Sequence, residues 1–284
     1  MKRLTIRDIQ KMKTNSQPIT MLTAYDATSA GIAEQADIPM ILVGDTLGMV
    51  VQGHDSTIPV KLEHMIYHAE IVTRVTNKPF VVGDLPFMTY SVSPEQALEN
   101  SGKLMQQAGV SAVKLEGGET MAPTIKRITE AGIPVMAHIG LIPQSVNQFG
   151  GFRVQGKQIE SARQLIRDAL AVQEAGAFAV VLELVPSTLS TLITEKLTIP
   201  TIGIGAGVGC DGQVQVFHDI LALFNDFVPK HTKQYTNVHD IMMRAVQQYH
   251  TEVIDRDFPT DDNGFTMSDD VIATLRDEVL NARD

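Results

Sequence analysis

The sequence predicts an α/β fold, specifically a (β/α)8 TIM barrel with a short N-terminal helix and an acidic C-terminal tail. Two observations predict it. Apolar, β-branched segments recur along the 284 residues with helix-like segments between them, and five of these segments end in an acid or a histidine. Continuous apolar character is typical of parallel strands buried on both faces. About eight such units favour a closed barrel, whose catalytic groups lie at the carboxyl ends of the strands.

The expected strands are separated by helix stops and by proline. Ile38-Pro39, Ile133-Pro134 and Ile199-Pro200 each introduce a strand after a helix. The expected strands are residues 20–24, 40–44, 80–84, 112–116, 135–138, 179–184, 201–204 and 227–228, of which the last is the shortest.

Helix boundary signals agree with this alternation. Residues 94–108 should form a helix, because Ser93 is a good N-cap and Gly109 is a good C-terminal stop. Residues 160–175 end at a glycine in the same way. Residues 6–13 predict a short helix that precedes the first strand at the bottom of the barrel.

Two glycine-rich segments are longer than ordinary connections. Residues 46–59 follow the second strand and residues 140–156 follow the fifth, both on the side of the carboxyl ends. Long ordered loops in that position usually shape or cover a site, whereas the alternative is a structureless insertion.

Composition bounds the class of protein. A hydrophobic content of 44% is enough for a sizeable core, and no run of about 18 apolar residues predicts a membrane span. The first 14 residues have no long apolar region, so a secretory signal is not expected. The single cysteine, Cys210, cannot form an internal disulfide, which fits a cytoplasmic location.

The charge is unevenly distributed. Lys and Arg number 23 against 33 Asp and Glu, which gives −10, and residues 258–284 contribute −5 through seven acids and two arginines. We therefore expect a single barrel domain at 1–257 and an acidic extension at 258–284, with a short helix that begins after Ser268. An acidic chain without a basic stripe is not expected to bind nucleic acid.

Two acids follow glycine at strand ends. Asp45 lies in VGDTLG and Asp84 in VGDLPF. Mg²⁺ prefers one or two carboxylates together with substrate oxygens and water, so two such neighbouring ends predict a metal site. Asp45 alone could cap a turn. Thr46 would place a hydroxyl beside the metal, although a surface threonine is the simpler alternative.

A lysine and a glutamate alternate with apolar residues in AVKLEGG. Strand alternation sends Lys114 and Glu116 to the same side, which in a barrel is the interior. Buried charges are costly unless they are paired or used. We expect Lys114 to bind a substrate anion and Glu116 to complete the metal shell; a purely structural pair between Lys114 and Glu116 is the alternative.

Two further strand ends carry titratable groups. Glu183 lies between leucines, and an apolar setting favours a general base, although an unseen partner could neutralise it. His138 is expected to support the site by hydrogen bonding. The glycines of residues 202–209 fail the dinucleotide fingerprint, because Val208 stands where its last glycine is needed.

These segments together closely resemble the ketopantoate hydroxymethyltransferase family. The matching blocks run in order over most of the chain, to about residue 249. They are TAYD (23–26), VGDTLGMVVQGHDST (43–57), DLPFMTY (84–90), VKLEGG (113–118), HIGLIPQSVNQFGG (138–151), LELVP (182–186), IGIGAG (202–207) and DG (211–212).

The resemblance implies a function. The family transfers a hydroxymethyl group from 5,10-methylenetetrahydrofolate to 3-methyl-2-oxobutanoate, giving 2-dehydropantoate and tetrahydrofolate, the first step toward pantothenate and coenzyme A. It implies one Mg²⁺ per subunit and a homodecamer. Carried onto this sequence, Asp45, Asp84 and Glu116 hold the metal. The same resemblance places Asp45, Thr46, Asp84 and Lys114 against the 2-oxoacid and makes Glu183 the proton acceptor.

Two features depart from the family pattern. Thr46 stands where the family usually has serine, which keeps the hydroxyl and stiffens χ1. The acidic tail extends beyond the usual family end, and the resemblance assigns it no role.

Two alternatives remain. One is a Mg²⁺-dependent 2-oxoacid C–C lyase or mutase of the phosphoenolpyruvate mutase/isocitrate lyase type, although the K-K-C-G-H pattern of several such enzymes is absent here. The other is a non-catalytic barrel retained for binding or assembly.

Overall fold

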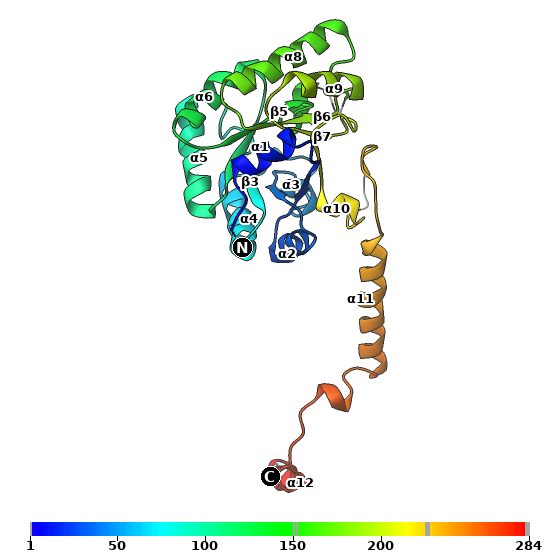
Figure 1. Ribbon diagram of the computed structural model, residues 1–284. Coiled ribbons are helices and arrows are strands. Elements are labelled where there is room, and N and C mark those ends of the chain that lie inside the picture. The colour runs from blue at the N-terminus through cyan, green and yellow to red at the C-terminus, as the bar shows by residue number, and fades with distance from the viewer. Residues whose placement is uncertain (1, 150, 152, 225–227, 282–284) are drawn as a thin grey trace. The chain divides into compact units, whose positions relative to one another are not determined.

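Eight parallel strands close into a barrel in sequence order, from β1 to β8, with helices around it (Figure 1). The structure is a computed structural model that describes residues 2–149, 151, 153–224 and 228–281. The predicted barrel of alternating strands and helices is therefore confirmed. The chain divides into two compact units, Met1–Thr236 and Asn237–Asp284, and the barrel lies in the first.

The strands are β1 (Ile19–Thr23), β2 (Met40–Val43), β3 (Phe80–Asp84), β4 (Ala112–Glu116), β5 (Val135–Gly140), β6 (Ala179–Glu183), β7 (Thr201–Ile204) and β8 (Gly212–Gln215). The helices of the first unit are α1 (Ile6–Thr14), α2 (Ala27–Gln35), α3 (Leu47–Val50), α4 (Leu62–Val75), α5 (Pro94–Ala108), η1 (Glu119–Met121), α6 (Ala122–Glu130), η2 (Pro143–Ser145), α7 (Val146–Phe149), α8 (Ile159–Glu174), α9 (Ser187–Lys196) and α10 (Phe217–Ile220). The second unit contains α11 (Val238–Asp255), η3 (Asp261–Asn263) and α12 (Asp269–Asn281).

Seven of the eight strands lie where the sequence predicts them, and β3, β4 and β7 have the predicted bounds. The prediction for the eighth strand was wrong. β8 is Gly212–Gln215, while Val228 is not in a strand and Phe227 lies outside the described residues. Its sequence, GQVQ, has no apolar run, so a search for hydrophobic segments passes over it.

Inside the barrel, alternate residues of the strands form one apolar layer. This interior layer includes Met40, Phe80, Met136 and Ile202, and Ile9 of α1 packs against it. Ile9 is fully buried, so α1 closes the bottom of the barrel as the sequence predicts. Residues of the opposite parity face the surrounding helices and form a second, larger core.

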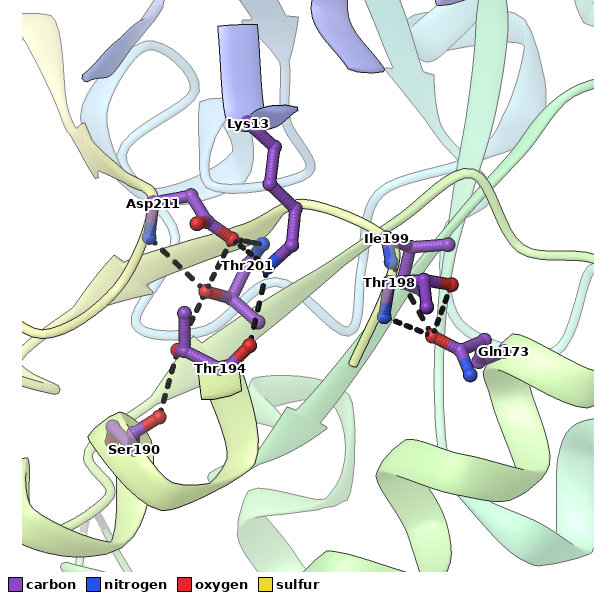
Figure 2. A network of polar contacts seen from close by, with 8 residues as sticks. All are labelled: Lys13, Gln173, Ser190, Thr194, Thr198, Ile199, Thr201 and Asp211. Atoms are coloured by element: carbon purple, nitrogen blue, oxygen red, sulfur yellow. Dashed lines mark hydrogen bonds and ion pairs between the residues drawn. The ribbon is translucent and has the colours of Figure 1, made fainter. Parts of the chain in front are cut away.

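Asp211 joins three elements where the barrel closes at its bottom (Figure 2). Its Oδ2 accepts hydrogen bonds from the backbone N–H of Thr201 at 2.8 Å and from Lys13 Nζ at 2.7 Å. Its backbone oxygen accepts from the N–H of Ile19 at 2.9 Å. The next residue, Gly212, has no room for a side chain, because a Cβ there would lie 2.3 Å from the Ile19 carbonyl oxygen. This contact therefore fixes β8 between β7 and β1.

In the second unit the helices α11 and α12 have no buried residue among those described. The predicted tail helix after Ser268 is present as α12. The domain boundary expected at residue 258 falls inside this unit, after α11, and the division into a barrel domain at 1–257 and an extension at 258–284 stays a prediction. No described helix is both long and apolar enough to span a bilayer.

Candidate active site at the carboxyl ends of the strands

The strand register brings the predicted residues together. Asp84 and Lys114 are Cα partners across β3 and β4, and Glu116 and His138 are partners across β4 and β5. Lys114 and Glu116 have the same parity as Ala112, which lies in the interior layer, so both point into the barrel as strand alternation predicts. Asp45 follows β2, next to the end of β3.

Asp84 binds two of its predicted companions directly. The Lys114 ammonium donates to Asp84 Oδ1 in a buried ion pair. The backbone N–H of Asp45 donates to Asp84 Oδ2 at 3.1 Å. A Cβ at Gly44 would lie 3.3 Å from that same oxygen and 3.0 Å from Thr46 Oγ1, so the glycine lets the end of β2 approach β3.

The carboxylate cluster, defined here as Asp45, Asp84, Glu116 and Lys114, is almost inaccessible to solvent: each residue is at most 4% exposed. When all are ionised, three carboxylates against one ammonium leave two uncompensated negative charges. Burial and the nearby carboxylates of Asp84 and Glu116 raise the pKa of Asp45 well above its usual range. Burial also raises the pKa of Asp84, although its contact with Lys114 opposes this.

The carboxylates of the cluster favour the charged form of Lys114. Burial alone would lower the pKa of its ammonium, but the carboxylates of Asp84, Glu116 and Asp45 outweigh burial and raise it. Lys114 is therefore a permanent cation in the site. Among the described residues Lys114 pairs with Asp84, and not with Glu116 as the structural alternative from the sequence had it. The pair leaves an excess of negative charge in the cluster.

Two residues of the site were missed from the sequence, Tyr90 and Gln144. Gln144 Nε2 donates to Asp45 Oδ2 at 2.8 Å, and the backbone N–H of Gln144 donates to Glu116 Oε2 at 3.0 Å. The Tyr90 hydroxyl donates to Gln144 Oε1 at 2.7 Å. Both side chains are uncharged and lie in loops with no periodic pattern. Their only signal was membership of the blocks DLPFMTY and HIGLIPQSVNQFGG.

His138 connects the cluster to Glu183. Its Nδ1 lies 3.5 Å from Glu116 Oε1 and its Nε2 lies 3.2 Å from Glu183 Oε2. Neither pair has hydrogen-bond geometry, so both are charge contacts. Burial would lower the pKa of His138, but these two carboxylates outweigh it and raise the pKa to about 9. The imidazole therefore acts as a cation between two acids.

Glu183 is less buried than the cluster, with 14% of its side chain exposed. Its flanking residue Leu182 packs in the outer core and so does not line the setting of the Glu183 side chain. The imidazole of His138 is its described ionic partner. Gly140 lies against it, since a Cβ there would be 2.3 Å from the Glu183 carbonyl oxygen.

Both long rim segments contain short helices. Residues 46–59 include α3, which begins after Thr46, and residues 140–156 include η2 and α7. The alternative of a structureless insertion is therefore wrong for the described parts of both segments. Thr46 is half-buried beside Gly44, so its hydroxyl lies next to the cluster.

The carboxylate oxygens are engaged by donors in this arrangement. Within the described part of the chain, no three His, Cys, Asp or Glu side chains are placed to hold one metal ion together. The donors that occupy these oxygens are an ammonium, two backbone N–H groups and the Gln144 amide. Carboxylate oxygen remains the ligand type that Mg²⁺ prefers, and Mg²⁺ sites commonly use only one or two protein carboxylates.

The fold and the cluster define a class: a parallel barrel with acids at the carboxyl ends of its strands. Solved structures of this shape include a putative phosphonomutase from Burkholderia cenocepacia, with a TM-score of 0.62 and 18% identity, covering 77% of this chain and 95% of that one. A phosphonopyruvate hydrolase has a TM-score of 0.59 and 15% identity over 98% of both chains. At these identities the likeness shows the fold alone.

The sequence comparisons identify the family. Residues 3–261 match the profile of the family described as ketopantoate hydroxymethyltransferase, and the chain belongs to that family. A protein from Chloroflexus aurantiacus named 3-methyl-2-oxobutanoate hydroxymethyltransferase is 59% identical over 257 residues, which are 90% of this chain and 91% of that protein. One of the same name from Dehalococcoides mccartyi is 54% identical over 274 residues, 96% of this chain and 97% of that protein.

Proposed function

We propose that this chain transfers a hydroxymethyl group from 5,10-methylenetetrahydrofolate to 3-methyl-2-oxobutanoate, giving 2-dehydropantoate and tetrahydrofolate. The names of its relatives in Chloroflexus aurantiacus and Dehalococcoides mccartyi give the hydroxymethyl transfer and its acceptor, 3-methyl-2-oxobutanoate. The folate donor follows from the resemblance to the family. The observation that carries the proposal is the buried cluster of three carboxylates and one lysine at the carboxyl ends of β2, β3 and β4. The reaction would begin the synthesis of pantothenate and coenzyme A.

A divalent cation fits the cluster by charge and by ligand chemistry. When the cluster is fully ionised, two negative charges remain after Lys114 is counted, and burial together with the neighbouring carboxylates raises the pKa of Asp45. We assign one Mg²⁺ per subunit to Asp45 and Asp84, with Glu116 completing its shell. When bound, the cation would polarise the carbonyl of the 2-oxoacid as a Lewis acid.

The 2-oxoacid would bind through groups that surround the cluster. Lys114 donates to Asp84 and, as an ammonium, has two further N–H donors for the substrate carboxylate. The Thr46 hydroxyl is the second donor that we assign to the substrate. Asp45 and Asp84, which we assign to the cation, would also line the binding site of the 2-oxoacid.

Glu183 is the base that we assign to the C3 proton of the 2-oxoacid. It is more exposed than the cluster and lies at the end of β6, two strands away from Glu116. The His138 imidazole lies 3.2 Å from Glu183 Oε2 and so holds the carboxyl group in place beside the substrate. His138 would support the site through this charge contact rather than through the hydrogen bonding that the sequence predicts. After proton loss, C3 forms the new carbon–carbon bond to the folate methylene carbon, whose two bonds to folate nitrogens break. Water supplies the hydroxyl group of the product, and the C3 proton and the remaining proton of water end on the two nitrogens of tetrahydrofolate.

Two wider properties belong to the same proposal. We propose a homodecamer and a cytoplasmic location on the resemblance to the family; the single, half-buried Cys210 is consistent with a reducing compartment. The small-molecule partners are then the 2-oxoacid and the folate.

The direct test incubates the protein with 3-methyl-2-oxobutanoate, 5,10-methylenetetrahydrofolate and Mg²⁺, and follows 2-dehydropantoate by proton NMR. The proposal expects product that appears only with all three components and stops when EDTA removes the metal. Absence of product from folded, metal-loaded protein would favour the lyase or mutase alternative, or a barrel without catalytic activity.

A further inference from the structure

Gln144 joins two of the predicted metal-binding residues, Asp45 and Glu116, to a rim loop. It is 4% exposed, and it follows β5 within the short segment of residues 141–147, which we name the β5 rim segment. Its Nε2 donates to Asp45 Oδ2 at 2.8 Å and to the Leu85 carbonyl oxygen at 3.0 Å. Its backbone N–H donates to Glu116 Oε2 at 3.0 Å.

The Gln144 amide can adopt only one orientation here. Both N–H donors of Nε2 are used, and Oε1 accepts from the Tyr90 hydroxyl at 2.7 Å. A flipped amide would direct Oε1 at the Asp45 carboxylate and the Leu85 carbonyl, so three acceptors would meet without a proton. The buried network is fully satisfied in one arrangement, which is the condition under which such a network fixes geometry.

Tyr90 closes the network from the other side. Its hydroxyl donates to Gln144 and also accepts from the backbone N–H of Glu116 at 3.3 Å. The positions of Asp45 and Glu116 are thus set by the same two residues, which come from the loops after β3 and β5. Neither loop is part of the strands that carry the two carboxylates.

We propose that Gln144 is a positioning residue that fixes the orientation of Asp45 and Glu116 toward the cation and 2-oxoacid, and that it couples their geometry to the order of the β5 rim segment. The orientation toward the cation and the 2-oxoacid rests on the proposed function. The coupling itself rests only on the contacts above. Tyr90 is the second member of the pair.

The test compares Gln144→Leu, which keeps size and removes the amide, with the wild type. Outer-shell partners of metal ligands typically contribute about 10- to 100-fold in metal affinity. We expect Gln144→Leu to weaken the calorimetric binding of Mg²⁺ with 3-methyl-2-oxobutanoate by about tenfold or more, with the KM for methylenetetrahydrofolate unchanged. Tyr90→Phe should weaken this binding as well. The double variant should lose less binding free energy than the sum of the two single variants.

Gln173→Leu is the matched control. Gln173 Oε1 accepts from the backbone N–H groups of Thr198 at 2.7 Å and Ile199 at 3.3 Å, at the bottom of the barrel and away from the cluster (Figure 2). It therefore loses a similar number of hydrogen bonds, in an exposed to part-buried position, without touching the site. If Gln144 served stability alone, Gln144→Leu would lower the melting temperature and, like Gln173→Leu, leave 2-oxoacid affinity unchanged, and the proposal would fail.

Amide hydrogen exchange supplies a readout that needs no substrate. Gln144→Leu and Tyr90→Phe should both increase exchange in residues 141–147, while Gln173→Leu should not. Unchanged protection there would contradict the coupling, whatever the wild-type activity. Conversely, a wild type that neither binds nor converts the 2-oxoacid would contradict the proposed function. The coupling between Gln144 and the β5 rim segment would then be tested by the hydrogen-exchange result alone.

Discussion

Asp84 shows at the scale of one residue how a buried carboxylate is held by partners on both of its oxygens. One carboxylate oxygen faces the Lys114 ammonium and the other accepts from the backbone N–H of Asp45. The residue therefore holds the end of β2, the interior face of β4 and the end of β3 in one arrangement. Because its partners on both sides belong to the proposed site, its loss should affect metal and substrate together.

Asp84→Ala should weaken the Mg²⁺ dependence and the 2-oxoacid affinity in parallel, each by at least the roughly tenfold that an outer-shell residue contributes. Calorimetric titration of Mg²⁺, with and without 3-methyl-2-oxobutanoate, measures both. Asp84→Asn, which keeps the shape, serves as the folding control. A Mg²⁺ titration of Asp84→Ala that matches the wild type would exclude Asp84 from the metal site.

Asp219 in α10 predicts a pH dependence of stability outside the cluster. Burial raises the pKa of Asp219 from 3.8 to about 6. A carboxyl whose folded pKa is raised contributes stability below its ordinary pKa, and this contribution is lost as the pH rises toward 6.

We therefore expect Asp219→Asn to stabilise the protein at pH 8 by about 1 kcal/mol, reduced from the full linkage because the group is partly exposed to solvent. The gain should shrink at pH 5. Thermal unfolding at both pH values measures it, with the exposed Asp277→Asn as control. Equal shifts at the two pH values would count against the burial argument.

Charged residues at strand ends could be predicted from the sequence because alternation and parallel pairing fix their direction. Lys114 and Glu116 illustrate this, since a single parity rule places both in the interior. Gln144 could not be predicted in this way. Its contacts depend on a loop conformation that brings it against Asp45, 99 residues away, and no local period encodes that.

At the scale of elements, β8 shows the limit of hydrophobic pattern. Its four residues include two glutamines and one glycine, so its position depends on neighbours rather than on its own apolar character. Gly212 allows close approach to β1, and the side chain of Asp211 binds Thr201 at the start of β7 and Lys13 of α1. The last strand of the barrel is thus specified by a polar contact at its start.

Asp211→Ala should lower the free energy of unfolding by about 1–3 kcal/mol, because the backbone N–H of Thr201 then loses its partner in a part-buried position. Asp211→Asn should fall between this variant and the wild type, since it keeps an acceptor oxygen and loses only the ion pair. Urea unfolding midpoints measure the order. If both variants unfold at the same urea midpoint as the wild type, the Asp211 contact does not stabilise the closure of the barrel.

The whole molecule combines a barrel with a separate acidic unit. Residues 258–284 carry seven acids and two arginines and hold half of the net charge of −10. The described residues of this extension are all exposed. The proposed catalytic groups all lie in the first unit, which is why a barrel with its site could be predicted while the extension received no role.

A chain that ends at Asp257 should therefore keep its activity within about twofold, since none of the groups that act in the proposed site is removed. Light scattering tests the assembly at the same time. A decamer of 31.0 kDa subunits would have ten times that mass, about 310 kDa for the full chain. Loss of activity together with loss of assembly would assign the extension a role in joining subunits.

The central claim is that the site removes the C3 proton of 3-methyl-2-oxobutanoate and that Glu183 accepts it. Proton NMR in D₂O with Mg²⁺ and no folate measures this step alone. The account predicts loss of the C3–H signal with wild-type protein. It also predicts an exchange slowed by at least about 100-fold in Glu183→Gln, which should still bind Mg²⁺ and the 2-oxoacid. Exchange at the wild-type rate by Glu183→Gln would contradict the assignment of the base, and no exchange by the folded, metal-loaded wild type would contradict the enolate chemistry itself.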